Sequence, residues 1–99
     1  MSDLIIELKK PYSYEGTEHT EINLTGLEGL TGLDLIKAKQ IYTKSGGFST
    51  VLASDPEYCA IVAHIATKLP LDFFTNAPAK IYTKVTTQVM VFLMGDSDE

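Results

Sequence analysis

Two histidines and one cysteine are the side chains best suited to nucleophilic or general-base chemistry. His64 lies five positions after Cys59. If both lie on one helix, a turn of about 100° per residue points them well apart, so they cannot form a local catalytic pair. A distant residue such as Asp72 would have to complete a site. We interpret His64 as a core or interface histidine, and His19, among threonines and glutamates, in the same way. We therefore predict no catalytic residue and a protein that is not an enzyme.

Metal and cofactor sites are not indicated by the sequence. Neither the histidines nor the cysteine occur in pairs at metal-ligand spacing. The glycines of residues 25–32 lack the GxGxxG or Gly-Lys-Thr patterns of phosphate-binding loops. Acidic residues that could bind a hard cation are interpreted as solvated: Glu15, Glu18, Glu21, Asp96, Asp98 and Glu99. We expect neither a metal nor a cofactor.

The charge balance and the single cysteine restrict the class of protein. Eight basic and thirteen acidic residues give a net charge of −5, and the basic residues are scattered. A phosphate-backbone partner needs a clustered positive face, so nucleic acid is disfavoured, although helix-turn-helix proportions alone leave that class open. No apolar stretch approaches a membrane span, and the acidic opening Met1-Ser2-Asp3 does not suit a secretion signal. We expect a cytoplasmic protein without nucleic-acid or membrane partners, in which Cys59 is buried.

Residues 55–69 carry the strongest helix signals. Asp55 can cap the first turn, Pro56 suits the first helical position, and Pro70 prevents continuation. The segment is apolar nearly all round, with no formal charge between Glu57 and Lys68. Such a helix has to be covered on more than one side. We predict that it is the central helix of the core.

The flanking segments predict one hairpin and further helices. Alternating apolar residues before and after Gly16 indicate a β-hairpin, with its first strand ending at Pro11. A helix is expected from Leu33 to the Gly46-Gly47 pair, with Thr31 and Asp34 as a capping box. A short helical turn at residues 71–74 and a long helix at residues 78–94 follow.

These elements predict the fold class and the domain. We expect a mainly α protein, in which an N-terminal β-hairpin precedes a compact bundle of three main helices plus a short helical turn. The hairpin would occupy residues 1–24 and the helical core residues 31–94, within a single domain of residues 1–95. Residues 96–99 would form a flexible acidic tail.

The last predicted helix has more apolar surface than a small helical core requires. Its apolar side is a candidate protein-binding surface, for which we nominate Ile81, Val85, Val89, Met90, Phe92 and Leu93. The competing interpretation is that the hairpin or the Phe73-Phe74 turn covers this side, which would then be ordinary core. The sequence does not choose between the two.

Taken together, the order of elements resembles the small tail assembly chaperones of long-tailed bacteriophages. The resemblance covers nearly the whole chain through short motifs. The segment Leu8-Lys9-Lys10-Pro11-Tyr12, the glycine turn and Thr17-Glu18-His19-Thr20-Glu21-Ile22 are similar to the opening element of that family. The other similar segments are Leu30 to Ala38, Asp55-Pro56-Glu57-Tyr58 through Leu69-Pro70, Ala77-Pro78-Ala79 and Val89-Met90-Val91-Phe92-Leu93.

The resemblance implies a non-enzymatic assembly factor in the host bacterial cytoplasm. Such proteins keep the hydrophobic tape measure protein soluble while tail tube protein polymerises around it. They are absent from the finished virion, and many also exist in a form extended by ribosomal frameshifting. The resemblance thus implies the tape measure protein as partner, the tail tube protein as a second one, and a homo-oligomer. The alternative is a structural tail or connector subunit that stays in the virion.

Overall fold

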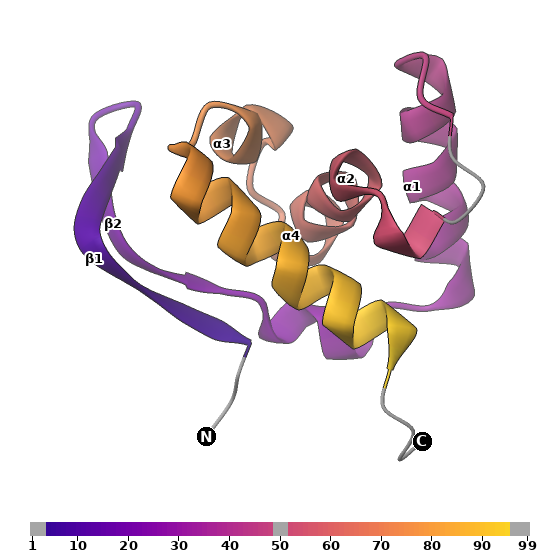
Figure 1. Cartoon of the computed structure of the whole chain (residues 1–99), viewed down its shortest axis with the longest axis horizontal. Helices are drawn as coiled ribbons and strands as arrows, with labels where there is room; N and C mark the ends of the chain where they lie inside the picture. Colours follow the sequence, from indigo (N-terminus) through magenta and orange to yellow (C-terminus); the bar gives the residue numbers. More distant parts are fainter. Residues whose placement is uncertain (1–3, 49–51, 96–99) are drawn as a thin grey trace.

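The computed structural model describes residues 4–48 and 52–95 of the 99-residue chain. The predicted acidic tail, residues 96–99, lies outside the described residues. In chain order the elements are β1 (Ile5–Tyr14), β2 (Thr17–Asn23), the 3-10 helix η1 (Thr25–Gly29), α1 (Gly32–Lys44), the 3-10 helix η2 (Leu52–Ser54), α2 (Pro56–Thr67), α3 (Leu71–Thr75) and α4 (Ala79–Met94). The hairpin and α1 lie on opposite sides of the molecule, with α2 and α4 between them (Figure 1).

Helix α2 is the centre of the fold. Asp55 accepts hydrogen bonds from the backbone N–H groups of Glu57 and Tyr58, so the predicted cap is confirmed. All six residues from Tyr58 to Ala63 are buried, and α2 contacts η1, α1, η2, α3 and α4. The helix ends at Lys68, which adopts a left-handed conformation and donates its N–H to the carbonyl of His64. As predicted from its apolar character, α2 is therefore covered on several sides.

The hairpin forms around a two-residue turn. Glu15 and Gly16 both have positive φ, at 51° and 84°, as in the type I′ turns that match strand twist. Strand β1 does not end at Pro11, as predicted, but runs on to Tyr14. The pairing jumps from Glu7 to Tyr12, so four residues of β1 lie opposite one residue of β2. Pro11 has no N–H to donate, and this irregular segment is where the strand tolerates it.

One face of the hairpin belongs to the core. The Tyr12 hydroxyl donates a buried hydrogen bond of 2.8 Å to the carbonyl of Phe73, and the two rings lie 5.0 Å apart. The centroid of the Phe73 ring also lies 4.8 Å from that of His19 and 5.3 Å from that of Tyr14, so this ring contacts both strands of the hairpin near its turn. The hairpin thus packs against α3 of its own chain.

The prediction of a mainly α protein is wrong. The strands comprise 10 and 7 residues, and the architecture is mixed α/β: a hairpin layer packed on helices. The hairpin and the residues directly before and after it supply a substantial part of the core: Leu4, Ile6, Tyr12, Ile22 and Leu24. Two strands are marginal alone, and their packing against α3 and α4 explains why they form here.

The capping box at the start of α1 is confirmed. The Asp34 carboxylate accepts the backbone N–H of Thr31 at 2.9 Å, while the Thr31 side chain faces the backbone of Asp34. None of the helices among the described residues is long and apolar enough to cross a membrane.

Candidate functional site

Helix α4 carries the predicted binding residues. It begins after Pro78 and ends at Gly95, whose φ of 79° stops the helix and whose N–H reaches the carbonyl of Val91 at 3.0 Å. Seven of its 16 residues are β-branched, which suits a strand, yet the helical spacing of its apolar side lets it pack on α2. Tertiary packing therefore outweighs local preference in this segment.

The inner side of α4 is core. Val85 and Val89 are both fully buried. Thr86 is also buried, and its hydroxyl donates to the carbonyl of Tyr82 at 3.0 Å, so no polar atom is left unsatisfied there. Two of the six nominated residues, Val85 and Val89, are thus turned into the protein and have no surface to offer a partner.

The outer side of the last turns is exposed and apolar. Val91, Met94 and Phe92 keep 58%, 60% and 36% of their surface accessible, while Met90 and Leu93 are half-buried. We call residues 90–94, Met90, Val91, Phe92, Leu93 and Met94, the α4 patch. Ile81, also nominated, is half-buried and lies nine residues before Met90, about 14 Å along the helix. It is separate from this patch.

Neither suggested cover buries the three exposed residues of the α4 patch, Val91, Phe92 and Met94. The Phe73-Phe74 turn belongs to α3, which lies beside the start of α4, whereas the patch is at the opposite end (Figure 1). The hairpin contacts α4 through β1 but leaves Val91 and Met94 exposed. Three large exposed apolar side chains within one turn of a helix, Val91, Phe92 and Met94, are typical of protein-binding sites.

The two most exposed residues of the patch, Val91 and Met94, were not among the nominated residues. The sequence contained a signal for them. They continue the stripe that begins with Lys80, Lys84 and Thr87, which share one side of the helix. The stripe is polar for two turns and then becomes apolar, and an apolar continuation of a solvent-facing stripe predicts exposed apolar side chains.

The structure shows the surroundings of the three residues considered for catalysis, Cys59, His64 and Asp72. Burial, together with the nearby Asp55 carboxylate, raises the pKa of the Cys59 thiol to about 11, so the thiol is protonated at neutral pH. The Nδ1 atom of His64 lies 2.6 Å from the carbonyl of Leu69, an arrangement in which Nδ1 carries the proton and donates it. Asp72 is exposed in the first turn of α3. Within the described residues, no three His, Cys, Asp or Glu side chains are grouped to hold a metal.

The chain matches no known family model, and no significantly similar curated protein or solved structure was found. The chemistry of its surface is therefore the basis for a functional assignment. The α4 patch has no charged residue, and its side chains include two flexible methionines. Such a surface can adapt to and bury apolar side chains of differing shape.

Proposed function

We propose that this protein is a non-enzymatic tail assembly chaperone of a long-tailed bacteriophage, and that the α4 patch binds apolar segments of the tape measure protein. The observation that carries the proposal is the exposure of Val91, Phe92 and Met94 at the end of α4. The motif order described above, which resembles that of tail assembly chaperones, supplies the identity of the client.

The charge of the chain suits this role. A net charge of −5 on each 99-residue chain makes assembled client complexes repel one another and so opposes their aggregation. An apolar patch on an acidic domain can therefore cover an aggregation-prone segment and keep the product dispersed. Because one patch is small, we propose that the protein acts as a homo-oligomer, in which several linked patches bind one long client and gain affinity through avidity.

The test is co-expression with the tape measure protein encoded in the same genome, with the soluble fraction of the client and its co-purification as readouts. The wild-type protein should keep the client soluble and co-purify with it. The double variant Val91→Asp, Met94→Asp should lose both effects. The matched control, Leu33→Asp, Phe48→Asp, places the same charges at exposed apolar residues elsewhere and should behave as wild type. Full client solubility with a folded patch variant would contradict the assignment of the patch.

The structural-subunit alternative makes a different prediction about the virion. A chaperone should be absent from purified particles, whereas a tail or connector subunit should be present in stoichiometric amounts. Quantitative mass spectrometry of particles, with the tail tube protein as internal standard, separates the two. Detection of this chain at a fixed ratio to tail tube protein would replace the chaperone proposal with the structural one.

A further inference from the structure

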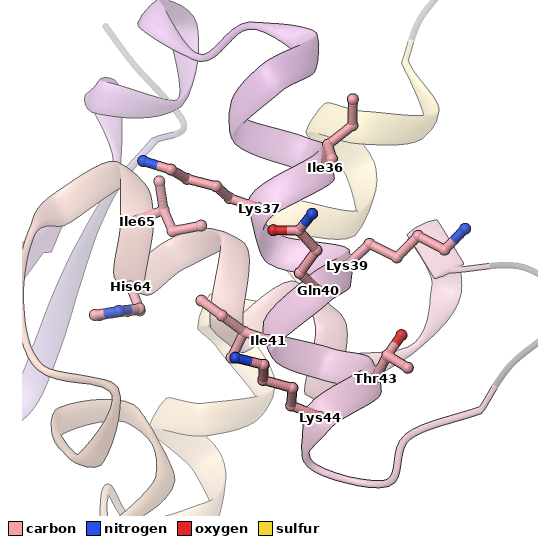
Figure 2. Close-up of a pocket in the computed structure, with 9 residues that line it drawn as sticks. All are labelled: Ile36, Lys37, Lys39, Gln40, Ile41, Thr43, Lys44, His64 and Ile65. Atoms are coloured by element: carbon pink, nitrogen blue, oxygen red, sulfur yellow. The ribbon is translucent and has the colours of Figure 1, made fainter.

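A second surface feature lies between α1 and the C-terminal half of α2. It is an open groove of about 990 Å³, at the upper end of the range for ligand sites. Figure 2 shows its lining side chains, which come from two helices: Ile36, Lys37, Lys39, Gln40, Ile41, Thr43, Lys44, His64 and Ile65. The groove is distinct from the α4 patch, with which it shares no residue.

Charged and apolar side chains alternate along the α1 wall of the groove. Lys37, Ile41 and Lys44 follow one another at intervals of four and three residues, so they share one side of the helix. Figure 2 shows both lysine side chains and Ile41 directed towards α2, whereas Lys39 points away. The two lysines are separated by two helical turns, about 10 Å along the axis. Ile65 of α2 lies opposite, so an apolar floor has an ammonium group near each end.

The positive charge of this groove is not compensated within the described part of the chain. Three of the eight basic residues of the protein line it, and none of the lining residues is acidic. No ion pair of Lys37, Lys39 or Lys44 occurs among the described residues. The groove is therefore positively charged in a protein whose net charge is −5. A surface of this kind selects partners that carry negative charge.

We propose that this groove binds an acidic amphipathic helix of a protein partner. A leucine-like side chain of that helix would lie against Ile41 and Ile65. Carboxylates seven residues apart would reach Lys37 and Lys44, because a partner helix repeats at the same two-turn interval as α1. This inference does not depend on the chaperone proposal.

Two features favour a protein helix over a nucleic acid. The apolar floor offers nothing to phosphate groups, and single-stranded nucleic acid sites add aromatic side chains on which bases stack. None of the residues that line this groove is aromatic. An amphipathic helix, in contrast, uses both the floor and the lysines.

The test uses the full chain and a fluorescently labelled 20-residue helical peptide with glutamates seven positions apart and a leucine four positions after the first. Binding is measured by fluorescence anisotropy at low and high salt. The Lys37→Glu, Lys44→Glu variant should bind this peptide at least about tenfold more weakly. The control variant Lys9→Glu, Lys10→Glu makes the same charge change at exposed residues of β1 and should stay within about twofold of wild type. A peptide with lysines in place of the glutamates should bind the Lys37→Glu, Lys44→Glu variant and not the wild type.

Three results would overturn the proposal. The first is equal weakening by both variants, which would mean that only net charge matters. The second is absence of peptide binding to the wild type at concentrations up to about 1 mM. The third is displacement of the peptide by a single-stranded oligonucleotide that binds the wild type more tightly than the peptide does. If the Lys37→Glu, Lys44→Glu variant no longer bound this oligonucleotide, the groove would be a phosphate site.

Discussion

The Tyr42 hydroxyl donates a hydrogen bond of 2.7 Å to Oδ2 of Asp55, while Oδ1 of the same carboxylate accepts the backbone N–H of Glu57 at 2.9 Å. The Asp55 side chain thus caps α2 and, through Tyr42, holds the last turn of α1 against it. The ring of Tyr42 meets that of Tyr58 edge to face, with centroids 6.0 Å apart. Tyr58 in turn donates to the carbonyl of Leu35 at 3.2 Å, so both halves of α1 are linked to the start of α2.

Removing the Asp55 carboxylate should therefore weaken two elements at once. We expect Asp55→Ala to lower the free energy of unfolding by about 1–2 kcal/mol from loss of the cap alone, with a further loss from the Tyr42 hydroxyl. Asp55→Asn can still cap and still accept from Tyr42, so it should cost less. Urea denaturation followed by circular dichroism measures both. Equal losses in the two variants would mean that these hydrogen bonds do not stabilise the junction.

The stability of the protein should fall at alkaline pH. The hydrogen bond to Asp55 raises the pKa of Tyr42 to about 12, helped by burial. Because the folded state holds this proton more tightly than the unfolded state, the stabilisation is complete below pH 10 and is lost as the pH rises towards 12. The pKa values of Tyr12, Tyr14, Tyr58 and Tyr82 are also raised, chiefly by desolvation, and act in the same direction.

The contribution of Tyr42 can be separated from that of the other tyrosines. Tyr42→Phe should be less stable than wild type at pH 8, and the difference should shrink as the pH rises from 10 to 12. Urea midpoints of the two proteins at pH 8 to 11.5 give this comparison. A difference that stays constant over this range would show that the Tyr42 proton is not linked to folding.

Gly26 should tolerate no side chain. A Cβ at this position of η1 would overlap the backbone carbonyl group of Ala66 in α2, and main-chain atoms of a helix cannot move aside easily. We expect Gly26→Ala to destabilise the protein by about 1–3 kcal/mol. Gly29→Ala, in the same 3-10 helix, meets no atom within 4 Å and is the matched control. Thermal unfolding of both variants should show a lower midpoint only for Gly26→Ala; equal midpoints would contradict the close approach of η1 to α2.

The same substitution at two valines of α4 should destabilise the protein by very different amounts. Val89 is fully buried, so Val89→Asp places an unpaired charge in the core and should cost about 3 kcal/mol or more. Val91 is exposed, and Val91→Asp should cost at most about 1 kcal/mol, from helix propensity and the negative end of the helix dipole. Circular dichroism with urea titration measures both. A stable Val89→Asp protein would show that this side of α4 is not core.

Local signals in the sequence located most elements correctly. Asp55 and Pro56 placed the start of α2, the Thr31–Asp34 pair placed the start of α1, and Gly16 placed the hairpin turn. These features depend on hydrogen bonds and backbone angles between residues at most a few positions apart, so neighbouring residues suffice to determine them. The nearly uniform apolar character of α2 also sufficed to predict that it is central.

Only the tertiary structure shows how the hairpin packs and which helix surfaces stay exposed. Periodicity shows that a strand has an apolar side, but the contact of Tyr12 with Phe73, 61 positions later, is what makes the hairpin a layer of a mixed α/β core. In α4 the apolar residues surround much of the helix near its end, so the packing of α2 had to select Val89 as core and leave Val91 exposed. The lysines of the groove all come from α1, but His64 and Ile65 of α2, about 20 residues or more further along the chain, join them only in the fold. Local sequence signals determine interactions between residues a few positions apart. Which surfaces of the helices stay exposed for a partner depends on packing between distant segments.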